Sequence, residues 1–195
     1  MRVPTYLLVF LVAALDASPQ SPSFHEEMFH GRHAYVLQTG RVRVSALRGA
    51  GHLAEIRFKS DDPRLSVNPM RVPHFQTIEP WEYKPEIHGK IYGSDTSRIL
   101  QSGYMGHLLN FPTFGGPSEH EAGNGLGTHG EALAVEWKKQ RAEAGAGGVT
   151  LVYQAELPKT RYRVSRTLWL PAGETVLYID ETVENLLPFD RPIHW

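Results

Sequence analysis

The sequence predicts an all-β protein with an antiparallel β-sandwich fold. Apolar residues recur at every second position in several segments, glycine and proline interrupt these segments, and no long helical pattern is present. The composition is that of a globular protein, because 41% of the 195 residues are hydrophobic and 21% are charged. This length is sufficient for one domain with its own core.

The start of the chain predicts a signal peptide over residues 1–17. A positive residue precedes the apolar run Tyr6–Ala14, which is too short to span a bilayer. Cleavage after Ala14 and cleavage after Ala17 both fit, and a buried N-terminal helix is the alternative. We therefore expect an exported protein, periplasmic or secreted, that has no membrane contact once this leader is removed.

A flexible segment is expected next, over residues 18–32, and the domain over residues 33–195. The run His25–His33 is rich in histidine and glutamate, which are common metal ligands. Because it directly follows the leader and a proline-rich stretch, we interpret it as solvated and mobile.

The first hairpin is predicted at residues 41–58. Residues 41–47 alternate between polar and apolar side chains, and residues 52–58 are apolar at every second or third position. The turn between them, Arg48–Gly51, contains two glycines, which readily adopt the positive φ angles of tight turns.

The last third of the chain predicts a meander. Val149, Leu151 and Tyr153 share one face of a strand, whereas Gln154 and Glu156 lie on the other. Turn residues separate the segments, so we expect antiparallel neighbours. The predicted strands are residues 131–138, 149–157, 162–170 and 174–185.

The stretch between residues 60 and 130 breaks the alternation with repeated prolines and glycines. Loops of this length are uncommon in a compact domain and are often functional, although an irregular surface excursion is the alternative. Sugar sites combine aromatic faces with acids, amides and arginines that bond to hydroxyl groups. The stretch supplies His74, Glu79, Trp81, Tyr83 and Arg98. For Trp81 a place in the core, and for Arg98 a structural salt bridge, stay open.

A glycine-rich segment, residues 115–130, carries Glu119, His120 and His129. Glycines let a backbone approach a ligand closely, so we expect these side chains to line a concave site with Trp81 and Arg98. A solvated loop without function is the alternative. Cupin-type metal binding by the histidines and carboxylates is a further one, but the spacing lacks a His-x-His pair, so no metal is expected.

Several other functions are disfavoured. The net charge of −1 provides no attraction for nucleic acid or an anionic membrane. The chain has no cysteine, which excludes disulfides and thiol catalysis within these residues. No phosphate loop, dinucleotide fingerprint or Gly-x-Ser-x-Gly motif is present, so no cofactor is expected. Oligomeric state stays open.

The order of these features resembles the N-terminal half of galactose mutarotase-like (aldose 1-epimerase-like) proteins. The resemblance covers most of residues 33–195, and the Pro-rich loop is closest to divergent bacterial members. The matching elements, in order, are Gly49–His52, Gly93–Arg98, the pair His129–Gly130, the strand bearing Trp137, and Glu181–Asn185.

The resemblance implies a β-supersandwich that interconverts sugar anomers. A base takes the proton of the anomeric hydroxyl, an acid protonates the ring oxygen, and the opened ring recloses to either anomer. It places His129 at the reacting centre and the acid at a histidine after the last strand, where only His194 is near. No residue matches the family's glutamate base, so we expect both groups beyond this chain.

The predicted function is thus sugar binding with aldose 1-epimerase-like chemistry. The alternatives are a non-catalytic carbohydrate-binding sandwich and a cupin-like metal enzyme. We also expect the sandwich to be incomplete at its C-terminal end, the natural protein to continue past Trp195, and an uncovered apolar face to contain Tyr153, Leu157 and Val164. The candidate site comprises His129 as the catalytic residue, with Arg98, Trp81, Glu119, His120 and His74 in sugar binding.

Overall fold

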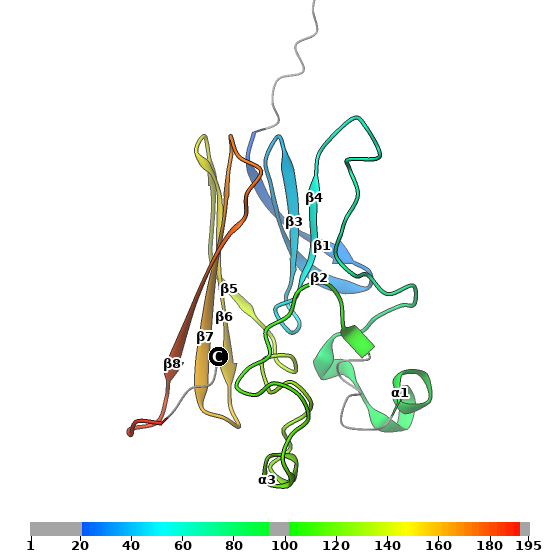
Figure 1. The fold of residues 1–195 in the computed structure, drawn as a ribbon, viewed down its shortest axis with the longest axis vertical. Helices are drawn as coiled ribbons and strands as arrows, with labels where there is room; N and C mark the ends of the chain where they lie inside the picture. Colours follow the sequence, from blue (N-terminus) through cyan, green and yellow to red (C-terminus); the bar gives the residue numbers. More distant parts are fainter. Residues whose placement is uncertain (1–20, 94–101, 192–195) are drawn as a thin grey trace, which may run out of the picture.

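The computed structural model describes residues 21–93 and 102–191. They form two four-stranded antiparallel sheets that face each other, with the short helices α1 and α3 at one end and the loop that follows β4 at the other (Figure 1). The strand order in each sheet follows the chain, β1-β2-β3-β4 and β5-β6-β7-β8. The prediction of an all-β antiparallel sandwich is therefore confirmed. The predicted leader, Arg98 and His194 lie outside the described residues.

The first sheet consists of β1 (Ser23–Phe29), β2 (Arg32–Gln38), β3 (Val42–Leu47) and β4 (Leu53–Phe58). The second consists of β5 (Lys138–Gly145), β6 (Gly148–Leu157), β7 (Tyr162–Pro171) and β8 (Tyr178–Asn185). The chain segment that connects the two sheets contains the short helices η1 (Pro80–Glu82), α1 (Pro85–Tyr92) and α3 (Glu119–Gly123). No helix in the described part of the chain is long and apolar enough to cross a membrane.

The predicted first hairpin is β3 and β4, which pair antiparallel. Its turn brings Gly51 against the buried Trp137 with a φ of +60°. A Cβ at this position would lie 2.5 Å from the indole ring. Glycine is therefore required both by the backbone conformation and by the packing.

The meander is confirmed at β6, β7 and β8, but its first strand is shifted from the prediction. The partner of β6 is β5, whereas residues 131–137 form a turn and an isolated bridge. Glu131 is the cause, because its carboxylate accepts hydrogen bonds from the backbone N–H groups of Lys159 (3.0 Å) and Thr160 (2.9 Å). Trp137, expected on a strand, is fully buried just before β5.

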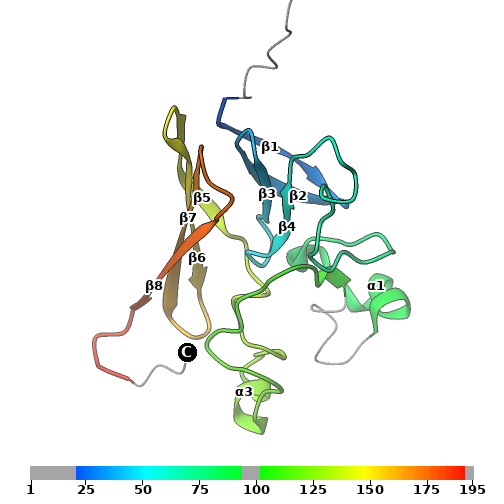
Figure 2. The same ribbon diagram turned by 45° about the horizontal axis from the view of Figure 1, so that its top comes forward.

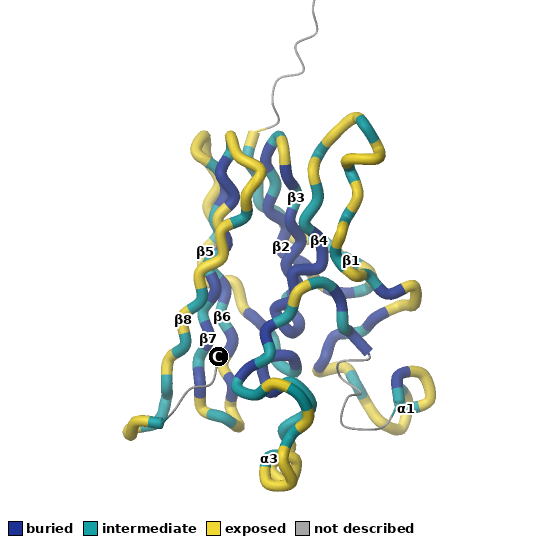
Figure 3. The backbone as a smooth tube through the Cα atoms, viewed as in Figure 1, coloured by how far each residue is buried: buried dark blue, intermediate teal, exposed yellow. Residues whose placement is uncertain are grey.

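Alternate side chains of both sheets meet in one core. Tyr153, Leu157 and Val164 are fully buried there, so the predicted uncovered face is wrong: the first sheet and apolar residues of the irregular segment, such as Phe111, cover it. Tyr35 links the two layers, because its hydroxyl donates to the carbonyl of Trp137 (3.2 Å) and accepts from the backbone of Lys139 (3.0 Å). Along β6 and β7, fully buried positions alternate with partly buried or exposed ones (Figure 3).

The segment expected to be flexible, residues 18–32, contains β1 and the first residue of β2. β1 pairs with β2 along its whole length, from Ser23 opposite Gln38 to Phe29 opposite Arg32 (Figure 2). Phe24 packs against the core, which fixes the strand. These residues are therefore part of the sandwich and not the mobile segment that we predicted.

A buried ion pair fixes the irregular segment to the first sheet. Arg32 is fully buried at the start of β2, and its Nε donates to Glu79 Oε2 (3.3 Å). Its Nη2 donates to the carbonyl of Gly49 (2.7 Å), while Glu79 Oε1 accepts from the backbone of His33 (2.8 Å). Because Pro80 directly follows Glu79, this pair sets the place of η1.

Candidate functional site

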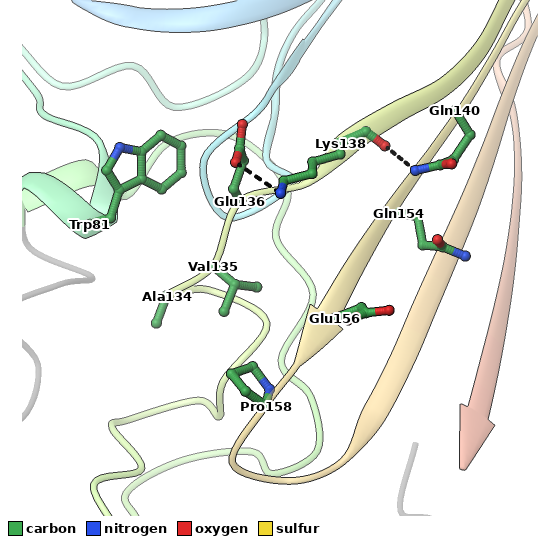
Figure 4. A pocket seen from close by; sticks show the side chains of 9 residues that line it. All are labelled: Trp81, Ala134, Val135, Glu136, Lys138, Gln140, Gln154, Glu156 and Pro158. Atoms are coloured by element: carbon green, nitrogen blue, oxygen red, sulfur yellow. Dashed lines mark hydrogen bonds and ion pairs between the residues drawn. The ribbon is translucent and has the colours of Figure 1, made fainter. Parts of the chain in front are cut away.

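A cavity of about 740 Å³ lies between η1 and the second sheet, and we call it the Trp81 cavity (Figure 4). Trp81 stands on one side of it, across from side chains of β5 and β6. The lining residues are Trp81, Ala134, Val135, Glu136, Lys138, Gln140, Gln154, Glu156 and Pro158. Aromatic, apolar, amide and charged groups therefore converge on one space.

Trp81 reaches the cavity because η1 is held from behind. Pro80 at the helix start is buried, and the Arg32–Glu79 pair fixes the residue before it. The indole itself is 46% exposed, so Trp81 is not a core residue. An exposed ring on a fixed backbone is available for stacking with a ligand.

The opposite wall is formed by the outward side chains of the second sheet. Gln154 and Glu156 occupy alternate positions on β6 whose neighbours point into the core. Gln154 Nε2 donates to Ser165 Oγ (2.8 Å), which orients the amide. Lys138 and Gln140 are two positions apart on β5, so both lie on this wall, and Gln140 coincides with an irregularity in the pairing between Lys139 and Arg141.

Charge pairing controls the carboxylates of the cavity. Hydrogen bonds from Arg163, and then its positive charge, lower the pKa of Glu156. Arg163 Nη2 lies 2.8 Å from Glu156 Oε1. Glu156 is thus ionised at neutral pH and acts as an acceptor, not as a proton donor. Glu136 is paired with Arg48 and lies 3.8 Å from Lys138 Nζ.

His129 lies on the glycine-rich loop and does not line the Trp81 cavity. Its backbone N–H donates to the carbonyl of Gly115 (2.8 Å), and its Nδ1 accepts from the backbone of Gly115 (3.0 Å). An acceptor Nδ1 in a neutral imidazole leaves the proton on Nε2. The half-buried ring, beside the exposed Phe114 at 5.2 Å between centroids, is therefore held as an Nε2–H donor.

The residue after His129 explains the His-Gly pair. Gly130 has a φ of +86°, and a Cβ there would lie 2.4 Å from the carbonyl oxygen of Phe111. His129 itself has a φ of 65°. Two successive left-handed residues turn the loop sharply, and only glycine fits at the second position.

The other predicted site residues are dispersed. Glu119 and His120 are exposed in α3, whose Ser118 and Glu121 form a capping box. His74 is exposed beside Phe75. Of the predicted residues that the structure describes, the Trp81 cavity contains Trp81 alone. The concave site expected to unite some of these residues with His129 and Arg98 is a different place from this cavity and stays a prediction.

The sequence interpretation missed the polar wall of β5 and β6. Gln154 and Glu156 were assigned to the outward face of a strand, but an outward polar residue does not by itself indicate a site. The signal that could have identified them was the combination with Gln140 and Lys138 on the neighbouring strand. Within residues 21–93 and 102–191, no three histidine, aspartate or glutamate side chains form a group that could hold a metal.

The fold defines a mutarotase-like β-sandwich. No family model and no curated protein matches the sequence. The fold is similar to that of YeaD from Salmonella typhimurium, a proposed mutarotase, with a TM-score of 0.51 and 14% identity over 76% of this chain and 43% of YeaD. Slr1438 from Synechocystis sp. PCC 6803 has a TM-score of 0.45 and 14% identity over 93% of this chain and 53% of its own. The chain thus spans less than half the length of YeaD.

Proposed function

We propose that this chain binds a carbohydrate in the Trp81 cavity, as part of an aldose 1-epimerase-like protein. The observation that supports this most directly is an exposed indole ring facing amide, carboxylate and ammonium groups across one space. A sugar ring presents an apolar face of C–H bonds to an aromatic ring and hydroxyl groups to polar side chains. The mutarotase-like fold supports the same class of ligand.

The hydrogen-bonding capacity of the cavity suits hydroxyl groups, which both donate and accept. Lys138 offers only donors, the ionised Glu156 offers only acceptors, and Gln140 and Gln154 offer both. A volume of about 740 Å³ is within the range of small-molecule sites. Ala134, Val135 and Pro158 supply the apolar remainder of the lining.

Anomer interconversion is the finer form of this proposal, and it depends on His129, which does not line the Trp81 cavity and would contact only a sugar that extends beyond it. Ring opening requires a group that donates a proton or hydrogen bond to the ring oxygen and a base for the anomeric hydroxyl. The bond from Gly115 holds His129 as an Nε2–H donor, which suits the first of these roles or the binding of a sugar oxygen. In the protein, His129 would act together with residues outside those described.

The test measures binding and mutarotation in the same variants. Isothermal titration with D-glucose, D-galactose and their disaccharides gives affinity, and polarimetry of freshly dissolved sugar gives the rate of mutarotation. We expect Trp81→Ala to weaken binding by about tenfold, because it removes the stacking face. We expect His129→Gln to reduce the catalysed rate much more than the affinity.

The exposed Phe58, at the end of β4 in the first sheet, provides the matched control. Phe58→Ala removes a similarly exposed ring and should leave binding unchanged. Absence of sugar binding by the parent protein, or equal binding by Trp81→Ala, contradicts the proposal. Binding without any catalysed mutarotation supports the non-catalytic carbohydrate-binding sandwich instead.

A further inference from the structure

A second group of exposed aromatic rings lies on the outward face of the second sheet. Trp169 on β7 and Tyr178 on β8 are cross-strand partners. Their ring centroids are 5.5 Å apart at an interplanar angle of 29°, and the residues are 43% and 48% exposed. The Tyr178 hydroxyl donates to Glu174 (3.2 Å), which restrains the ring. We call this pair the Trp169 stack.

The Trp169 stack and the polar wall of the Trp81 cavity share one face of one sheet. Side chains alternate along β7, so Ser165 and Trp169 point outward while Leu168 is buried. In the register, Ser165 is opposite Gln154 of the cavity wall. Trp169 follows Ser165 by four positions, which corresponds to roughly 13 Å along the strand. The polar wall of the Trp81 cavity and the Trp169 stack therefore lie on one continuous face of the sheet.

The surface between them is low and rich in hydroxyl groups. The outward residues of β6 to β8 there are Thr150, Val152, Ser165, Thr167, Asp180 and Thr182, and on β5 the charged pair of Arg141 and Glu143 borders them. Short side chains leave room above the sheet, and hydroxyl and carboxylate groups bond well to sugar hydroxyls. The centre of a stable protein–protein interface is usually more apolar than this surface.

We propose that the ligand of this chain is an oligosaccharide, which extends along the outward face of the second sheet from the Trp81 cavity to the Trp169 stack. The proposal rests on the proposed function, because it takes the cavity to be a sugar site. A monosaccharide cannot reach from one aromatic group to the other. A chain of several units can stack on both, with its intermediate units over the hydroxyl-bearing strands.

The test is the dependence of affinity on chain length. Titration uses three series, each from monosaccharide to hexasaccharide: β-1,4-linked glucose, α-1,4-linked glucose and β-1,4-linked galactose. In at least one series, we expect the hexasaccharide to bind about tenfold more tightly than the disaccharide, because it gains a second stacking contact. Trp169→Ala should abolish this gain and leave disaccharide affinity within about twofold.

Each outcome separates the two proposals. Binding of the small sugars without any gain on lengthening overturns the extended site and leaves the Trp81 cavity intact. Failure of every sugar to bind overturns both. Light scattering of the parent and of Trp169→Ala tests the competing occupant: a dimer that dissociates in the variant makes the stack a contact between copies, which also overturns the extended site. Phe58→Ala is again the control and should retain the gain.

Discussion

The meander of β5–β8 and the irregular segment between residues 59 and 137 are stabilised in different ways. β6 and β7 pair over ten positions, and their inward side chains, including Leu151 and Leu168, are fully buried. The meander also buries Arg166 of β7, which pairs with Glu181. The described part of the irregular segment buries fewer apolar side chains in this core, such as Phe111, and is attached to the sandwich by buried carboxylates as well. Glu79 pairs with Arg32 from β2, and Glu131 accepts bonds from the turn between β6 and β7.

This difference decides how each region responds to substitution. An apolar strand face loses free energy in proportion to the volume removed, and its neighbours can partly adapt. A buried charge has no such tolerance, because losing its partner leaves an unpaired ion in a medium of low dielectric. The irregular segment carries Trp81 and His129, so the candidate site depends on the less tolerant of the two regions.

The largest effect is expected for Arg32→Met. The substitution leaves the Glu79 carboxylate buried without its cation, and we expect the free energy of unfolding to fall by about 3–5 kcal/mol. The segment should also lose a second attachment, because the hydrogen bond from Arg32 Nη1 to the carbonyl of Gly103 disappears. Urea denaturation followed by circular dichroism measures the first effect, and amide hydrogen exchange around η1 measures the second.

A double-variant cycle provides the control. Arg32→Met combined with Glu79→Leu removes both charges, so it should be less destabilised than the sum of the two single variants. Additive losses would show that the two residues act independently, and the role that we give the pair in placing η1 would be wrong.

A smaller effect is expected in the meander. Leu168→Ala removes a fully buried side chain from β7 and should cost about 3 kcal/mol. The neighbouring Thr167→Ala, on the outward face, should change stability by less than about 0.5 kcal/mol. Exchange protection in η1 should be unaffected by either variant at low denaturant. Equal costs at the two positions would mean that the inward and outward faces are wrongly assigned.

Most of the meander could be predicted from sequence because its information is local. Alternation and turn residues place β6 and β7 to within one residue, and the β3–β4 hairpin equally well. The wrong predictions concern segments whose structure depends on residues far away in the sequence. The sequence of residues 131–137 alternates as in a strand. The Glu131 carboxylate, however, accepts hydrogen bonds from the backbone of Lys159 and Thr160, and residues 131–137 form a turn. β1 was missed because its pairing with β2 outweighs a polar composition.

The candidate site was only partly predictable. The exposed Trp81 was identified by residue type, since an aromatic residue in a proline-rich loop is a common ligand contact. The Gly130 conformation also accounts physically for the His-Gly pair. Glu119, His120 and His74 do not line the Trp81 cavity, because proximity in sequence within a long loop does not determine proximity in space. Gln154 and Glu156 became relevant only when the sheet register placed them opposite Trp81.

The smallest expected effect concerns His52, which lies between the two regions. His52 directly precedes β4 and is 2% exposed. Burial, and then the positive charges of Arg32 and Arg166, lower its pKa well below the ordinary value of 6.5, and His107 adds to the shift. The imidazole is therefore neutral in the folded protein, whereas the unfolded chain takes up a proton once the pH falls below about 6.5.

The direction in which pH changes the folding stability follows from this difference in proton uptake. Because the unfolded state binds the additional proton, stability is unaffected above pH 6.5 and declines as the pH falls from there toward the folded pKa of His52. One proton contributes at most about 1.4 kcal/mol per pH unit. In His52→Leu this contribution is absent, so its stability should fall less steeply than that of the parent in urea titrations between neutral pH and about pH 5. His74→Leu, which changes an exposed histidine, is the matched control for the substitution itself. Parallel curves for His52→Leu and the parent would show that His52 takes up a proton in the folded state as readily as in the unfolded chain.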